Sequence, residues 1–132
     1  MTAADITAVR HPRRGRRVLA PIAERIAADR RAARQAHAAG DVAEAWRLLE
    51  ETHILSQPWP WGHIRSHADM LWLAVRGRDR RELLGQLLRI AVAGPGSALG
   101  RYPAGNTGRA HVPATQPMPI PDELAALLSS SS

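Results

Sequence analysis

THILSQPWPWGHIRSHADMLW, residues Thr52–Trp72, is the stretch that decides the fold. On both sides of its centre, apolar residues recur at the spacing of an amphipathic helix. Pro58 and Pro60 lie between the two runs, and proline ends one helix but is tolerated in the first turn of the next. The stretch therefore predicts two helices joined by a tight turn, with the second helix starting at about residue 61.

Further helices are expected on both sides of this pair. Upstream, AAGD at residues 38–41 supplies a glycine that can stop a helix and an aspartate that can cap the next one. Downstream, GRD at residues 77–79 precedes a leucine-rich run. Such short connections make consecutive helices antiparallel neighbours. The expected helices cover residues 18–39, 42–56, 61–76 and 80–93, and the last carries Leu83, Leu84, Leu87, Leu88 and Ile90 as its apolar positions.

The segment after these helices changes in character. Residues 94–121 hold six of the ten prolines and show little periodicity, so they predict either a disordered tail or a strap that wraps the helices. PDELAALL then predicts a short helix at residues 122–128, before a disordered end at 129–132. The expected fold is all-α, either an antiparallel four-helix bundle or a helical-hairpin array. The apolar residues that favour a strap are Tyr102, Val112, Met118 and Ile120.

Composition limits the possible functions. The chain has 132 residues, which suits one domain, expected at residues 18–128. It contains no cysteine, which excludes disulfides, thiolate metal sites and thiol catalysis. Five arginines against one aspartate in residues 1–17 predict a basic, flexible tail, whose contact with nucleic acid would be nonspecific. No apolar run is long enough to span a membrane, so we expect a cytoplasmic protein without membrane contact.

Three histidines of the opening stretch form a candidate metal site. His63 and His67 are four residues apart and therefore share one helix face. His53 lies about one turn before the hairpin and His63 about one turn after it, so all three should meet at one end of the bundle. Imidazoles suit zinc, copper, nickel or cobalt, and can share one ion only if their nitrogens lie within about 5 Å. Glu50 and Met70 are further candidate ligands, because each lies three residues from one of these histidines.

The same residues also support a metal-free alternative. The histidines can be hydrogen-bonded core residues, and Met70 can be core filler. The protein is then a helical interaction module that docks an unidentified protein partner. Its docking surface would be the turn with Trp59 and Trp61, or the strap, where Asn106 and Arg109 lie in GNTGRA. Enzyme activity is not expected, because no acid–base pair or activated nucleophile is placed by the sequence.

Two family resemblances accompany these patterns. QAHAAGDVAEAWRLLEETHILSQP resembles a tetratricopeptide-type helical hairpin, a likeness that covers residues 20–58. EETHILSQPWPWGHIRSHADMLWLAV, LLGQLLRI, GPGSALGRYPAGNTGRAHV and PMPIPDELAALL occur in this order between Ala20 and Leu128. Together they resemble a bacterial family of short proteins catalogued only as a domain of unknown function. The second resemblance implies that the histidine-rich junction and the strap belong to one domain.

Overall fold

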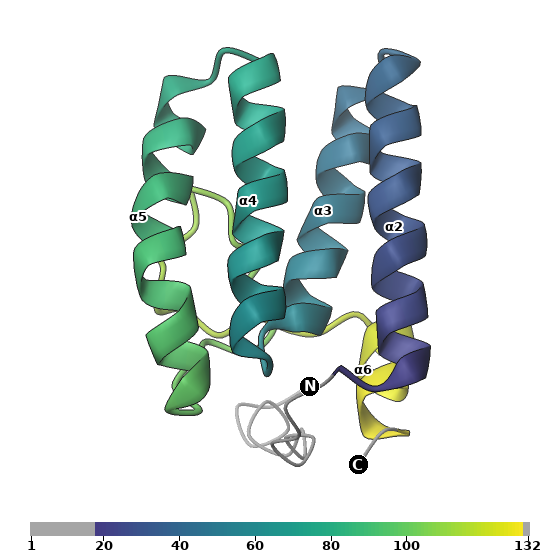
Figure 1. The fold of residues 1–132 in the computed structure, drawn as a ribbon, viewed down its shortest axis with the longest axis vertical. Helices are drawn as coiled ribbons and strands as arrows, with labels where there is room; N and C mark the ends of the chain where they lie inside the picture. The colour runs from purple at the N-terminus through teal and green to yellow at the C-terminus, as the bar shows by residue number, and fades with distance from the viewer. Residues whose placement is uncertain (1–17, 131–132) are drawn as a thin grey trace.

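The all-α prediction is confirmed. A computed structural model describes residues 18–130, and within them the chain forms five helices and no strand. The four long helices follow one another as two antiparallel hairpins (Figure 1). The predicted tail at residues 1–17 and the last two residues of the predicted disordered end lie outside the described residues. The helices are α2 (Ala20–Ala38), α3 (Val42–Ser56), α4 (Pro60–Arg76), α5 (Arg80–Ala98) and α6 (Asp122–Ser129).

The helix boundaries follow from local chemistry. Gly40 has a φ of +83°, a conformation that favours glycine, and ends the turn after α2. The carboxylate of Asp41 accepts a hydrogen bond from the main-chain nitrogen of Glu44 at 3.1 Å, so it caps α3 as predicted. Pro60 occupies the first turn of α4, where its missing N–H costs nothing. The turn sequences therefore place the helix ends within one or two residues of the prediction.

The expected end of α5 at residue 93 is wrong. The helix continues through Pro95 to Ala98. Tertiary contacts outweigh the local cost of that proline. A Cβ on Gly94 would lie 2.7 Å from Cδ1 of Ile64, so α4 and α5 approach closely there. One turn later the hydroxyl of Ser97 donates to the main-chain oxygen of Gln57 at 2.6 Å. The strap is therefore five residues shorter than predicted.

The orientation of α5 is the opposite of what its leucines predict. Glu82, Gln86, Arg89 and Ser97 share one face of the helix and are at most 9% exposed. The leucine-rich face points to solvent instead. A helix normally buries its apolar face, so this inversion requires a polar interior for the buried side to bind. The large apolar side chains left exposed on or directly after α5 are Leu84, Leu87, Leu88, Val92 and Leu99.

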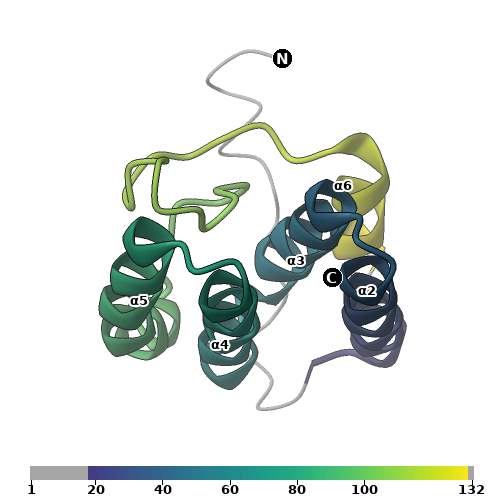
Figure 2. The ribbon, with the colours of Figure 1, turned by 90° about the horizontal axis from the view of Figure 1, so that it is seen from above.

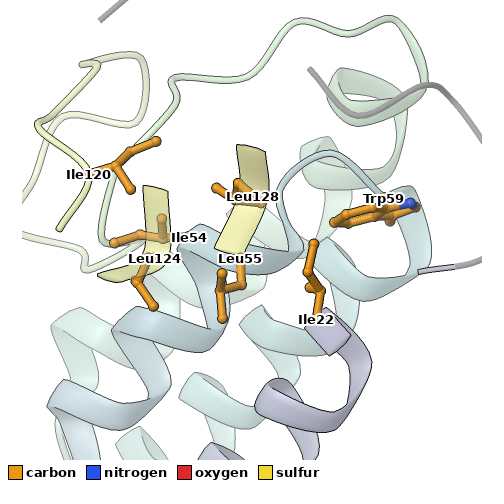
Figure 3. Packing of buried hydrophobic residues seen from close by; sticks show 7 residues of the cluster. All are labelled: Ile22, Ile54, Leu55, Trp59, Ile120, Leu124 and Leu128. Atoms are coloured by element: carbon orange, nitrogen blue, oxygen red, sulfur yellow. The ribbon is translucent and has the colours of Figure 1, made fainter. Parts of the chain in front are cut away.

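The long helices form an open row rather than a closed ring. α3 packs against α2 and α4, and α4 packs against α5, whereas within residues 18–130 α2 and α5 do not contact each other. Figure 2 shows the strap, now residues 99–121, running back from α5 across one side of this row to α6. α6 then packs on α2 and α3. The cluster that anchors it contains Ile22, Ile54, Leu55, Trp59, Ile120, Leu124 and Leu128 (Figure 3).

None of the helices within residues 18–130 combines the length and the apolar character that crossing a membrane requires.

Candidate metal centre

The three predicted histidines meet inside the protein and are called here the histidine triad. His53 extends from α3, His63 and His67 extend from α4, and none is more than 6% exposed. The Nε2 atom of His53 lies 3.0 Å from that of His63 and 3.1 Å from that of His67. The Nε2 atoms of His63 and His67 are 3.2 Å apart. The triad thus forms a nearly equilateral triangle of nitrogens, within the separation predicted for one shared ion.

Hydrogen bonds to Nδ1, the ring nitrogen outside the Nε2 triangle, fix the position of the proton on two of the histidines. Nδ1 of His53 lies 2.7 Å from the main-chain oxygen of Asn106, which can only accept. Nδ1 of His67 lies 2.6 Å from Oε1 of Gln86. The amide nitrogen of Gln86 donates to the main-chain oxygen of Gly108 at 2.9 Å, which fixes the direction of the amide. Both histidines therefore carry their proton on Nδ1.

The hydroxyl of Ser97 fixes the position of the proton on the third histidine, His63. Nδ1 of His63 lies 2.7 Å from the hydroxyl oxygen of Ser97. That hydroxyl gives its single proton to the main-chain oxygen of Gln57, so its oxygen accepts from His63. The side chain of Gln57 is itself held, because its amide nitrogen donates to the main-chain oxygen of Pro103 at 2.9 Å. All three imidazoles are thus neutral with the proton on Nδ1.

This arrangement turns three lone pairs toward one point. No Nε2 atom of the triad carries a proton, so the short nitrogen–nitrogen contacts cannot be hydrogen bonds between neutral rings. A single added proton could bond to two of the nitrogens, whereas a metal ion bonds to all three. Transition-metal ions bind imidazole nitrogens at about 2.0 to 2.1 Å, so three nitrogens 3.0 to 3.2 Å apart could hold one ion together. Three histidine ligands would leave the fourth position of a tetrahedral ion open.

Burial disfavours protonation of the triad. It lowers the pKa of His53 well below the ordinary value of 6.5, and the other two rings add to this effect. The pKa of His63 is lowered to about 3, first by burial and then by the charge of His67. Burial lowers the pKa of His67 to about 4. The triad is therefore neutral at physiological pH, which is the form that binds metals.

The strap completes the site by close approach of its main chain. Gly108 has a φ of +82°, and a Cβ at this position would lie 2.8 to 3.0 Å from three atoms of the His53 ring. Only glycine fits there. A pocket of about 650 Å³ lies between the strap and α5, and all three histidines contribute to its wall. The triad therefore borders a space that a ligand can enter.

The two further ligand candidates do not join the triad. Met70 is fully buried, but it lies in a separate apolar cluster of α2, α3 and α4 that also contains Leu49 and Leu73. Its thioether thus fills the core. The carboxylate of Glu50 accepts from the guanidinium of Arg109 at 3.1 Å. Both residues fall on the predicted helices, and the carboxylate of Glu50 lies outside the cluster of candidate ligand atoms that the three histidines form.

The predicted docking residues are mostly not on the surface. Trp59 is 4% exposed and packs in the α6 cluster, whereas Trp61 is 82% exposed, so the two indoles do not form one surface. Asn106 is 2% exposed, and its amide nitrogen donates to main-chain oxygens within the strap. Arg109 stacks 3.7 Å above the ring centroid of Trp46 and pairs with carboxylates. These corrections have one cause, since the strap and α6 cover the helix junction.

Several residues that shape the site were missed by the sequence analysis. They are the polar residues of α5, the strap glycine, and the glutamine at the end of α3. One signal was available, because the polar positions of α5 recur at helical spacing between its leucines. The choice of the leucine face as the buried one hid that signal. The missed residues are Gln57, Glu82, Gln86, Arg89, Ser97 and Gly108.

Replacing Gln86 by leucine is expected to weaken metal binding about tenfold, the lower end of what losing the partner of a ligating histidine costs. The change removes the acceptor that keeps the proton of His67 on Nδ1. Part of the population then carries the proton on Nε2, where it blocks the ion. The affinity is measured by competition with a chromophoric chelator. Gln116→Leu, in an exposed part of the strap, is the control, and an equal loss there would contradict the tautomer argument.

Comparison with known proteins identifies the family. A search of curated proteins and a search of solved structures gave no match. A family model described as "Protein of unknown function (DUF3703)" matches residues 20–128, which include the histidine triad and the strap. The suspected family is therefore confirmed. With more than half of its length matched, this chain belongs to the DUF3703 family of proteins of unknown function.

Proposed function

We propose that this protein binds one transition-metal ion through the Nε2 atoms of His53, His63 and His67, as a small accessory or metal-homeostasis protein. The observation that carries the proposal is the convergence of three unprotonated nitrogens on one point. Buried polar groups normally find a partner. In each ring the Nδ1 proton has an acceptor, but no donor reaches the lone pair of Nε2. A cation would bond to that lone pair.

The surroundings of the triad also support a metal over a structural role. A core histidine needs one donor and one acceptor, and only the acceptors are provided here. The acceptors on Nδ1 are the kind of partner that orients ligating histidines and increases their basicity. Three nitrogen ligands suit zinc, cobalt, nickel and copper. Because Met70 lies in a separate cluster, the preference for copper(I) loses its basis.

The metal-free interaction module has less support. Its tryptophan surface is reduced to Trp61, and a single exposed aromatic side chain is ordinary for a protein surface. Of the strap residues proposed for docking, Asn106 uses its side chain for hydrogen bonds within the strap, and Arg109 uses its guanidinium to hold the strap on α5. Replacing Trp61 by alanine should therefore leave both metal content and stability unchanged.

Elemental analysis of untagged protein purified without chelator tests the proposal. We expect close to one ion per chain in the wild type and none in the His63→Ala, His67→Ala double variant. The matched control is His37→Ala with His111→Ala, which removes two histidines outside the triad and should keep the ion. Wild-type protein that is metal-free and fails to take up added zinc, copper, nickel or cobalt would overturn the proposal.

A further inference from the structure

We infer that the open position of the bound ion takes a small organic carboxylate with a short apolar chain, held in the pocket beside the triad. This inference rests on the proposed function and specifies the ligand of the same site. The pocket of about 650 Å³ is large enough for such a molecule, and its wall includes the three histidines. A metal with three protein ligands commonly binds an exogenous group in its fourth position.

A buried arginine gives the pocket its preference for an anion. Arg89 lines the pocket and is 9% exposed. Its guanidinium donates to the main-chain oxygens of Gly108 and Val112, and within residues 18–130 it has no carboxylate partner. These two bonds occupy two of its five N–H groups, which leaves donors for a ligand. Arg89 and the three histidines contribute to the same pocket wall.

The charged side chains around the triad would not neutralise the positive charge of a bound ion. Glu82 and Glu50 are the carboxylates nearest to this region, and both pair with Arg109, at 2.6 Å and 3.1 Å. These two anions balance the two cations Arg109 and Arg89. A divalent ion on neutral histidines therefore adds two positive charges to a buried site, which is costly without an anion. A carboxylate between the ion and Arg89 reduces this charge and can bond to both.

The rest of the pocket selects a carboxylate with an apolar chain. Apart from the histidines and Arg89, its wall includes a second cation, Arg101, on the exposed side. Alkyl and proline side chains supply much of the remaining wall, so a chain of methylene groups gains free energy by leaving water. The apolar residues lining the pocket are Val92, Ala93, Pro103, Ala114 and Pro117.

Cobalt-loaded wild-type protein provides the test, because the visible spectrum of cobalt(II) reports its ligands. Acetate, butyrate and hexanoate are titrated, with butanol and butylamine as uncharged and cationic controls. We expect the carboxylates alone to shift the spectrum, with Kd falling about fourfold for each added methylene. Arg89→Gln should weaken butyrate at least tenfold, and Arg89→Lys, which keeps the charge, should weaken it less.

The outcomes separate this inference from the proposed function. Protein that does not bind cobalt fails the proposed function. Protein that binds cobalt but shows no spectral change with any carboxylate overturns only the inference. Carboxylates that bind with the same Kd whatever their chain length overturn the apolar part of the pocket argument. Because the chain-length series uses wild-type protein, the result stands even if the Arg89 variants do not fold.

A second observation, the inverted α5, carries an independent proposal. The geometry points to a second copy of this chain as the occupant of the exposed leucine face. Leu84, Leu88 and Leu99 are 66%, 68% and 64% exposed. Between residues 83 and 99 the only charged residue is Arg89, which is buried on the opposite side of the helix. An uncharged apolar strip is complementary to itself rather than to an acidic or basic partner.

The strip fits an antiparallel pair of α5 helices about a two-fold axis. Pairing centred between Ala91 and Val92 places Leu84 against Leu99 of the other copy, with the small alanine at the crossing. Burying the exposed apolar side chains on both copies removes roughly 1,000 Å² from water, about the minimum for a specific interface.

Sedimentation analysis across the micromolar range tests this pairing, in metal-free and metal-loaded protein. We expect the wild type to be a dimer and the Leu84→Glu, Leu88→Glu variant to be a monomer with unchanged helicity. Val75→Glu changes a side chain that is 53% exposed on α4, outside the strip, and should remain a dimer. A monomeric wild type, or a dimer that survives the double substitution, would overturn the proposal.

Discussion

Gly108→Ala is expected to lower the metal affinity more than about 100-fold, beyond the loss typical of a weakened ligand partner. The new Cβ would lie 2.8 Å from Cδ2 and 3.0 Å from Nε2 of His53, closer than real contacts allow. Either the ring or the strap must move. If the ring moves, the ion loses one of three ligands. If the strap moves, His53 loses the Asn106 carbonyl that fixes its proton. Chelator competition on purified protein measures the loss.

Gly40→Ala is the matched control for this substitution. Gly40 has a φ of +83°, almost the same as the +82° of Gly108, so alanine meets the same backbone strain at both positions. No atom lies within 4 Å of a Cβ at Gly40. The control should therefore lose some stability, about 1 kcal/mol, but keep its metal affinity. Equal affinities for the two variants would show that contact between Gly108 and His53 does not shape the site.

The sequence was sufficient to predict the core of the site because that part depends on local rules. His63 and His67 share a helix face by their spacing, and the prolines place His53 beside them across the turn. The Nε2 triangle is the direct result. Helix boundaries with glycine or aspartate signals were predicted well for the same reason, since a cap depends on neighbouring residues only.

The rest of the site depends on contacts between distant segments. The partners of the triad come from α5 and the strap, as far as 53 residues along the chain from the histidine they orient. Ser97 could not be placed by a rule that ends a helix before Pro95, because its position depends on the packing of α5 against α4. The docking alternative placed Trp59 at the surface because nothing near it in sequence reveals that α6 covers the junction.

The inverted orientation of α5 explains why the surroundings of the triad differ from the prediction. A helix that presents Glu82, Gln86, Arg89 and Ser97 to the interior surrounds the triad with polar partners. It also leaves its leucines outside. A protein without a buried polar site would gain stability by rotating this helix, because burial of leucine is favourable and burial of arginine is costly. The orientation of α5 is therefore the one that a buried polar site beside the histidines requires.

Metal-free protein is expected to lose at least about 4 kcal/mol of unfolding free energy between pH 8 and pH 5. The unfolded chain takes up protons near pH 6.5, whereas the folded protein holds the pKa of His63 at about 3 and that of His67 at about 4. Between these values the unfolded state binds more protons, so stability falls as the pH falls. It is fully retained above pH 6.5. By pH 5 His63 and His67 have each cost about 2 kcal/mol. The lowered pKa of His53 adds a loss in the same direction.

Urea unfolding followed by circular dichroism in the presence of a chelator measures this slope. The loss is comparable to the whole stability of a small domain, so the metal-free protein should unfold in mild acid. His67→Gln removes one titrating group and should make the slope shallower by about 1.4 kcal/mol per pH unit. A free energy of unfolding that stays constant from pH 7 to pH 5 would mean that the triad takes up protons in the folded protein as it does in the unfolded chain. Burial would then not hold the three imidazoles neutral, and the argument that they meet as three unprotonated nitrogens would fail.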